Sequence, residues 1–252
     1  MRLGLEVILL LAAAGARAQN DPISTGIYDA TSTYSFAIAG TAPSHNIFSG
    51  LADGRTLLML TGDWDHQIHQ GRKIDYRWEV EVLPVVEMTD PRERTKTIIT
   101  TAAGTFVDVN DFLPLSPCKS YSQTSVYLSG PPGYPAGPGT VTYTQLCSTE
   151  WDYLGGVSPL GQRVSWRPGK RLQPYWIANA GFLAATKPVP MFDAARFNFT
   201  AETGAGLEWF VAPRRSLAFD VRYHHMSNGG RADNNPGVDS IAFRATYRFG
   251  RR

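Results

Sequence analysis

The chain has 252 residues, 43% of them hydrophobic, and a formal net charge of +2 at pH 7. With a charge so close to zero and no extended run of lysine or arginine, the sequence gives no reason to expect a nucleic-acid partner. Beyond the N-terminus, no segment reaches the about 18 uninterrupted apolar residues that a membrane-spanning helix needs. We therefore expect either a soluble protein or a membrane-spanning β-barrel.

The first residues, MRLGLEVILLLAAAGARAQN, have the pattern of a secretory signal peptide. Arg2 precedes an apolar run at 7–14, and small residues follow in an A-x-A cleavage pattern that ends at Ala18. We predict a signal peptide at 1–18 and one exported domain at 19–252.

Apolar and polar residues then alternate with a period of two, which is typical of β-strands that have one apolar and one polar face. In IDYRWEVEV, which begins at Ile74, aromatic and aliphatic residues alternate with Asp, Arg and Glu. The alternation returns in FNFTAETGAGLEWFV from Phe197, and no stretch has a convincing helical period. The predicted strands lie at 33–41, 54–65, 73–85, 154–167, 171–185, 197–211, 216–227 and 238–250.

Eight strands joined in sequence favour an all-β fold, an antiparallel up-and-down barrel, because closure removes the edges of an open sheet. The predicted connections alternate strictly between short and long, as periplasmic turns and extracellular loops do in outer-membrane barrels. The longest connection, at 86–153, is predicted to be a long extracellular loop inserted into the barrel domain, with room for a hairpin of its own because TVTYTQL at 140–146 is strand-like.

Cys118 and Cys147 are the only cysteines, and both lie in this predicted loop. An even number of cysteines in an exported chain favours one disulfide. A metal site is the alternative, although two sulfur ligands without a CxxC motif are a poor set for it.

A period of two does not say which face of the strands is outside. A soluble ligand-binding barrel has its charged face outside, whereas a membrane barrel has its apolar face outside. The export signal, the aromatic residues near the strand ends and the mixture of Arg with Asp and Glu on the polar face favour a transmembrane barrel in the outer membrane. In a narrow lumen these mixed charges can pair.

Three polar residues interrupt the apolar face at the last predicted hairpin. His225 and Ser227 continue the apolar stripe of one strand, and Asp239 is in phase with the apolar residues of the next. A symmetric hairpin places Ser227 roughly opposite Asp239, with His225 next along the same face. A serine hydroxyl becomes nucleophilic when a base takes its proton and an acid orients the base. The alternative is ordinary polarity at a strand end, which costs only about 0 to 1 kcal/mol near the membrane interface.

The H-x-S-N pattern at 225–228, followed by NPGVD at 235–239, resembles the lipid A 3-O-deacylase (PagL) family of outer-membrane acyloxyacyl hydrolases. The resemblance is strongest over 155–249. It implies an eight-stranded barrel whose lipid-facing wall carries Ser227 as nucleophile, His225 as base and Asp239 as acid. The implied reaction is hydrolysis of the 3-O acyl ester of lipid A, the membrane lipid part of lipopolysaccharide, without a cofactor or metal.

The resemblance also implies oxyanion stabilisation by Asn235 and by backbone N–H groups near Asn228 and Gly230. The chain departs from the family pattern at the acid, which is usually Glu. Asp239 is one methylene shorter, so its contact with His225 is expected to need a shifted backbone or a bridging water. The alternative function is a non-catalytic outer-membrane barrel for adhesion or envelope integrity, and the sequence leaves open whether the barrel forms a homodimer.

Overall fold

The computed structural model describes residues 30–128 and 137–251, so the predicted signal peptide lies outside the described residues. No helix in these ranges is long and apolar enough to cross a membrane. The described residues form ten β-strands in one antiparallel sheet. The strands are β1 Ser32–Thr41, β2 Leu57–Gln70, β3 Ile74–Thr101, β4 Gly104–Phe112, β5 Tyr121–Tyr127, β6 Gly139–Trp166, β7 Leu172–Ala185, β8 Phe197–Ala212, β9 Arg215–Ser227 and β10 Val238–Arg251.

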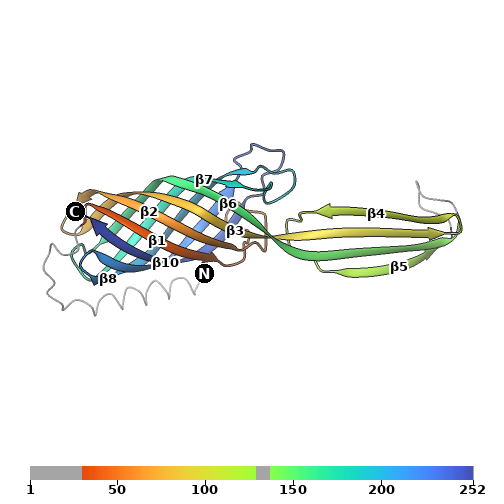
Figure 1. Ribbon diagram of the computed structural model, residues 1–252, viewed down its shortest axis with the longest axis horizontal. Coiled ribbons are helices and arrows are strands. Elements are labelled where there is room, and N and C mark those ends of the chain that lie inside the picture. The colour runs from red at the N-terminus through yellow and green to blue at the C-terminus, as the bar shows by residue number, and fades with distance from the viewer. Residues whose placement is uncertain (1–29, 129–136, 252) are drawn as a thin grey trace.

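Eight of these strands close into a barrel in the order β1-β2-β3-β6-β7-β8-β9-β10 (Figure 1). The ring closes because β10 pairs with β1, from Ser32 opposite Arg251 to Thr41 opposite Ala242. Each strand pairs with its neighbours in antiparallel register, so the predicted up-and-down barrel is confirmed.

The segment at 86–153 differs from the predicted loop, because most of it is strand. β3 and β6 have 28 residues each, and they stay paired well beyond the barrel, as far as Thr101 opposite Gly139. β4 and β5 pair with their outer edges, which gives a four-stranded sheet in the order β4-β3-β6-β5. This sheet, called the extension below, projects from one end of the barrel (Figure 1). Its β-branched residues favour strands, and cross-strand pairing satisfies their backbone groups.

The predicted disulfide between Cys118 and Cys147 is present. Cys147 lies on β6, opposite Glu93 of β3, and Cys118 lies in the connection between β4 and β5. The disulfide therefore fastens this connection to the extension.

The charged face of the barrel strands is inside and the apolar face is outside. Side chains such as Glu81, Arg222 and Arg244 are buried in the lumen, whereas Phe36, Phe219 and Phe243 are each more than half exposed. This is the arrangement of a membrane barrel and the reverse of a soluble ligand-binding barrel. The protein is thus an outer-membrane barrel, as predicted.

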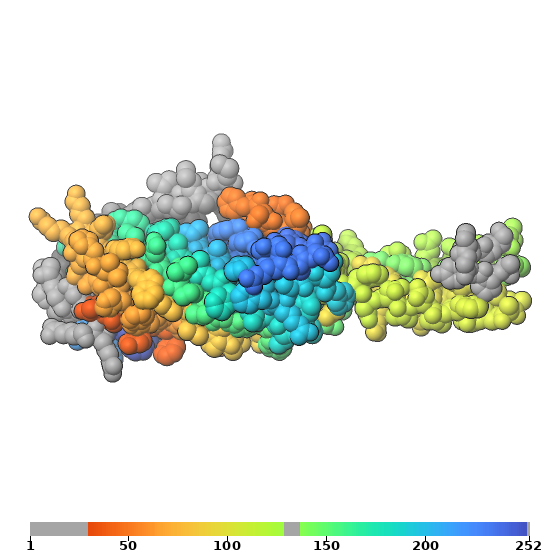
Figure 2. All heavy atoms as spheres, turned by 90° about the horizontal axis from the view of Figure 1, so that it is seen from above, coloured from red at the N-terminus to blue at the C-terminus, as the bar shows by residue number. Residues whose placement is uncertain are grey.

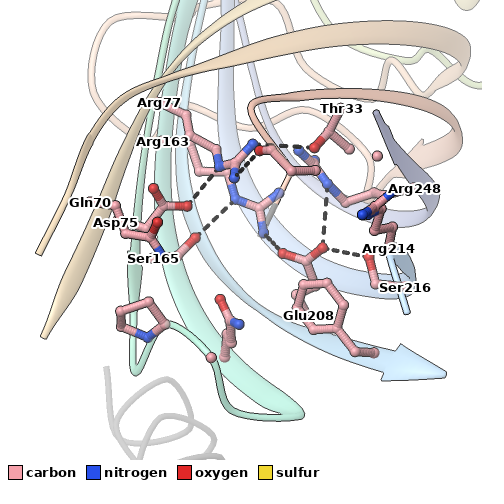
Figure 3. A pocket seen from close by; sticks show the side chains of 16 residues that line it. Thr33, Gln70, Asp75, Arg77, Arg163, Ser165, Glu208, Arg214, Ser216 and Arg248 are labelled. Atoms are coloured by element: carbon pink, nitrogen blue, oxygen red, sulfur yellow. Dashed lines mark hydrogen bonds and ion pairs between the residues drawn. The ribbon is translucent and has the colours of Figure 1, made fainter. Parts of the chain in front are cut away.

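Charged side chains fill the lumen at the end of the barrel that holds the C-terminus. There, Arg163 Nη2 lies 2.5 Å from Glu208 Oε2, and Arg77 Nε lies 2.7 Å from Asp75 Oδ2 (Figure 3). Buried charges are tolerated in a barrel when they are paired in this way. An apolar cluster that includes Met59 and Met226 fills the part of the lumen nearer the extension.

The short turns and the longer connections lie at opposite ends of the barrel. The turns at 71–73, 167–171 and 213–214 share the end that holds the C-terminus (Figure 1). The connections at 42–56 and 228–237 lie at the end from which the extension projects. In outer-membrane barrels the longer connections are extracellular, so the last residues of β9 and the first residues of β10 lie at the extracellular rim.

Candidate active site

The end of β9 presents three polar side chains on the outer wall of the barrel. Tyr223, His225 and Ser227 are half-buried and alternate with His224 and Met226, which are buried in the lumen. The His224 ring accordingly contacts the lumen residue Thr200, with 3.0 Å between Nε2 and Oγ1. The strand therefore separates its two adjacent histidines, and only His225 faces outward.

His225 and Asp239 are directly opposite each other in the β9–β10 ladder. The imidazole Nδ1 is 2.6 Å from the carboxylate Oδ1, which is a direct hydrogen bond. The His225 side chain keeps 22% of its surface exposed, while the Asp239 side chain is fully buried. A buried carboxylate and an outward-facing imidazole are thus in contact.

The register of this hairpin corrects the sequence-based expectation, which placed Ser227 opposite Asp239. The ladder begins at Val238 opposite Met226, and Ser227 lies beyond it, paired with Phe199 of β8. Gly237 has a φ of 62°, which lets the chain turn sharply into β10. Because directly opposite residues have Cβ atoms about 5 Å apart, the short Asp239 side chain reaches His225 without a shifted backbone or a bridging water.

The Asp239 carboxylate accepts three further hydrogen bonds. Tyr223 Oη donates to Oδ1 at 2.8 Å. The backbone N–H groups of Phe48 and Ser49 donate to Oδ2 at 2.8 and 3.0 Å. No sequence signal indicates these donors, because two are backbone groups and the third is a tyrosine in an apolar stripe.

The segment that supplies these backbone donors, residues 42–53, folds over the start of β10. His45 N donates to Asp239 O at 3.1 Å, and Ala52 N donates to Gly237 O at 3.1 Å. A Cβ at Gly50 would lie 2.5 Å from Asp239 N, so only glycine allows this approach. Figure 2 shows the segment, in orange, against the blue C-terminal part of the chain near the base of the extension.

Ser227 lies next to an aromatic surface on the outer wall. Its strand partner Phe199 packs edge to face against Phe197, with 5.6 Å between ring centroids. The guanidinium of Arg231 lies over both rings, 5.2 Å from the centroid of Phe197 and 5.1 Å from that of Phe199. The serine is thus flanked by an apolar platform and a cation.

The loop after Ser227 is braced by its own asparagines. Asn228 N donates to Asn235 Oδ1 at 2.9 Å, and Gly230 N donates to Asn228 Oδ1 at 2.9 Å. Asn228 Nδ2 in turn donates to Asn234 O at 2.7 Å. In this conformation the predicted oxyanion donors Asn228 and Gly230 use their N–H groups inside the loop, and the exposed Asn235 keeps its amide N–H₂ group.

No metal site is evident in the part of the chain that the structure describes. Within residues 30–128 and 137–251, no group of three or more His, Cys, Asp or Glu side chains is arranged to hold a metal ion. The polar residues at the rim instead form a chain of hydrogen bonds from Tyr223 and segment 42–53 through Asp239 to His225.

The fold and the orientation of its two faces define an outer-membrane β-barrel. Residues 124–248, just under half of the chain, match the family model described as lipid A 3-O-deacylase (PagL). Over these residues the chain is similar to lipid A deacylases, which are ester hydrolases. The resemblance noted in the sequence is thus confirmed. No curated protein matches the chain.

Three solved outer-membrane proteins match the chain at low sequence identity. The outer membrane enzyme PagL is 12% identical, with a TM-score of 0.49 over 84% of this chain and 97% of that chain. Neisserial surface protein A is 10% identical, with a TM-score of 0.42 over 86% of this chain and 96% of that chain. LpxR from Salmonella typhimurium is 8% identical, with a TM-score of 0.26 over 86% of this chain and 99% of that chain.

Proposed function

We propose that the protein is a serine esterase of the outer membrane that removes the ester-linked 3-O acyl chain from lipid A. The observation that carries this proposal is the 2.6 Å contact between His225 Nδ1 and Asp239 Oδ1 on the lipid-facing wall, with Ser227 two residues further on the same face. The match of residues 124–248 to the lipid A 3-O-deacylase family model supports the substrate and the position of the ester.

In the first half of the reaction, Ser227 Oγ attacks the carbonyl carbon of the ester while His225 Nε2 takes the Oγ proton. Asp239 holds the Nδ1–H tautomer of His225 and stabilises the imidazolium that forms. The tetrahedral intermediate collapses when His225 gives the proton to the sugar oxygen, which leaves as a hydroxyl. The acyl chain is then bound to Ser227 as an ester.

In the second half, a water molecule attacks the acyl-enzyme and His225 takes its proton. The Ser227 oxygen leaves, recovers the proton from His225, and the fatty acid is released. The negative charge on the carbonyl oxygen needs hydrogen-bond donors in both halves. Asn235 is the candidate side-chain donor, and backbone N–H groups at Asn228 and Gly230 can contribute only if the loop exchanges the hydrogen bonds that they make in this structure.

The place of the site suits a substrate that is itself a membrane lipid. The three residues lie on the outer wall at the extracellular rim, where the head group and the first carbons of an outer-leaflet lipid are found. A soluble ester would gain nothing from this location. Lipid A would bring its ester bonds to the rim by diffusion in the plane of the membrane.

The position of Arg231 favours a substrate with an anionic head group. Its guanidinium lies over Phe197 and Phe199 beside Ser227, and the residue is exposed. Guanidinium groups form strong, often bidentate, hydrogen bonds with phosphate. A phosphate of lipid A could therefore pair with Arg231 while its acyl chains lie against the apolar wall.

A second candidate function is adhesion or envelope integrity, and the extension favours it. The extension projects beyond the barrel and exposes large apolar side chains such as Val107, Val126 and Leu146. Exposed apolar residues and open strand edges are features of contact surfaces. This role would not require Ser227, so the experiment below separates the two candidates.

The test is mass spectrometry of lipid A after incubation with the folded protein in detergent, compared with Ser227→Ala. The proposal predicts loss of one acyl chain with the native protein only, and fragment ions should place the loss at position 3. Loss of a different chain would retain the esterase and correct the position. Unchanged lipid A with a verified folded barrel would support the non-catalytic role.

A further inference from the structure

We infer that Tyr223 and the segment at 45–50 are positioning elements that make Asp239 able to act on His225. The inference rests on the proposed function, because Asp239 is taken there as the acid of the triad. The carboxylate clamp, as we name it, consists of the Tyr223 hydroxyl and the backbone N–H groups of Phe48 and Ser49. No part of the clamp touches the substrate in the proposed reaction.

The clamp occupies the hydrogen-bonding capacity of the carboxylate. Oδ1 accepts from His225 Nδ1 at 2.6 Å and from Tyr223 Oη at 2.8 Å. Oδ2 accepts from Phe48 N at 2.8 Å and from Ser49 N at 3.0 Å. A carboxylate offers about four lone-pair sites. With four donors arranged around it, the Asp239 side chain has one orientation, which directs Oδ1 at the imidazole.

A buried carboxylate on the lipid-facing wall needs such donors. Asp239 is fully buried although its strand neighbours in phase, Ile241 and Phe243, face lipid. An ionised carboxylate without donors is costly in an apolar environment. Tyr223 and the backbone donors supply the polar surroundings that water supplies elsewhere, so Asp239 can remain charged beside His225.

The parts of the clamp hold each other in place. The rings of Phe48 and Tyr223 meet edge to face, with 5.0 Å between centroids and 88° between planes. Leu51 N donates to Pro236 O at 2.5 Å, which ties the segment to the loop before β10. Gly50 lies so close that a Cβ would be 2.7 Å from Asp239 Cγ. Displacement of the segment would therefore remove two donors at once.

The first experiment is Tyr223→Phe, assayed with a short-chain ester and with lipid A. The ring stays, so its packing against Phe48 is kept, and only the hydroxyl donor is lost. We expect kcat to fall by about tenfold, since a hydrogen bond to a charged group is lost, with KM unchanged. The matched control is Tyr247→Phe on the outer face of β10, whose ring contacts Phe249, and we expect no change in kcat.

The pH profile separates positioning from a purely structural role. Without the Tyr223 donor the Asp239 carboxylate should be more basic and should hold the proton of His225 more tightly. The acid limb of the profile should then move to higher pH in Tyr223→Phe and stay in place in Tyr247→Phe. The titratable and charged side chains on the lumen side, His224 and Arg222, are unchanged in both variants.

The second experiment is Gly50→Ala, because the backbone donors cannot be removed by substitution. The added Cβ must displace the segment from Asp239, and we expect a fall in kcat larger than that of Tyr223→Phe. The matched control is Gly40→Ala on β1, where a Cβ would meet nothing within 4 Å. Folding of each variant is checked by the heat-dependent mobility of the barrel in gels and by circular dichroism.

Failure of the proposed function and failure of the clamp give different results. If Ser227→Ala and Asp239→Asn keep native activity, the triad is wrong and the clamp has no role in catalysis. If both are inactive while Tyr223→Phe and Gly50→Ala keep the native kcat and pH profile, the triad stands and the clamp is overturned.

Discussion

His225 of β9 and Asp239 of β10 are directly opposite strand partners whose side chains meet at 2.6 Å between Nδ1 and Oδ1. In the proposed triad, this register lets an aspartate take the place of the glutamate in the family pattern. The shorter side chain spans the distance between two facing residues, and the clamp of Tyr223, Phe48 and Ser49 closes around its carboxylate. The length of the Asp239 side chain therefore matches the distance to His225 and to the clamp donors.

The first prediction concerns the length of the acid. Asp239→Glu should lower kcat for a short-chain ester by about tenfold or more, because the added methylene must be accommodated between Gly50 and the clamp donors. Kinetics in detergent check this, with Asp239→Asn as the reference for loss of the acid, expected at about 10⁴-fold. A glutamate variant as active as the native protein would show that the fit of the acid is unimportant.

The barrel was predictable from the sequence because its strands have one charged and one apolar face. The extension was predicted only as a loop with one strand-like stretch at 140–146, because its outer strand β4 has no buried face. Residues 95–100 read TKTIIT, with no alternation between apolar and polar residues. Its long pairing between β3 and β6 depends on residues far apart in the sequence, such as Ile99 and Val141.

The site was predictable in part for the same reason. The alternation of side chains along β9 and β10 predicted that His225, Ser227 and Asp239 lie on the outer face, and the structure brings His225 and Asp239 together. The donors at Phe48 and Ser49 had no sequence signal, since nearly all residues have a backbone N–H. These two residues also lie about 190 positions from Asp239 in the sequence. The register was mistaken because Ser227 was taken to lie opposite Asp239, whereas the ladder begins at Val238 opposite Met226.

The second prediction concerns Arg231. If its guanidinium pairs with a phosphate, Arg231→Ala should lower kcat/KM for lipid A by about five- to tenfold and leave a neutral short-chain ester unaffected. The control is Arg215→Ala, an exposed arginine at the other end of β9. Equal losses on both esters would indicate that Arg231 supports the fold around Ser227 and does not recognise charge.

The third prediction concerns the disulfide. Replacement of Cys118 and Cys147 by alanine should make the extension sensitive to protease and leave ester hydrolysis unchanged. The physical reason is that the connection at 113–120 stays joined to segment 42–53 without the disulfide, through the hydrogen bond from Asp53 N to Leu115 O at 2.7 Å, and that β3 and β6 lie across the ring from β9 and β10. Limited proteolysis with and without reductant measures the first effect. A parallel loss of activity would show that the extension and the site are coupled.

The fourth prediction concerns Arg55, which is fully buried where the barrel meets the extension. Its Nε donates to Asp90 Oδ1 at 2.8 Å, and its other nitrogens donate to the carbonyls of Asp53, Pro114, Leu115 and Pro190. Arg55→Met should lower the free energy of unfolding by roughly 3 to 5 kcal/mol, since Asp90 would be left buried and unpaired. Urea unfolding of the detergent-folded barrel measures this.

Two further variants make the Arg55 prediction specific. Arg55→Met combined with Asp90→Leu should recover part of the loss, because no buried charge is then left without a partner. Arg94→Met breaks an exposed ion pair with Asp111 and should change stability by about 0 to 1 kcal/mol. Similar losses in Arg55→Met and Arg94→Met would contradict the account.

Labelling with a fluorophosphonate, followed by peptide mass spectrometry, shows directly whether Ser227 is an activated nucleophile. The folded native protein should carry a single adduct on Ser227, and labelling should be strongly slowed in His225→Ala and Asp239→Asn. A native protein that stays unlabelled at Ser227, or one that is labelled at the same rate in all three forms, would contradict a catalytic triad on the lipid-facing wall.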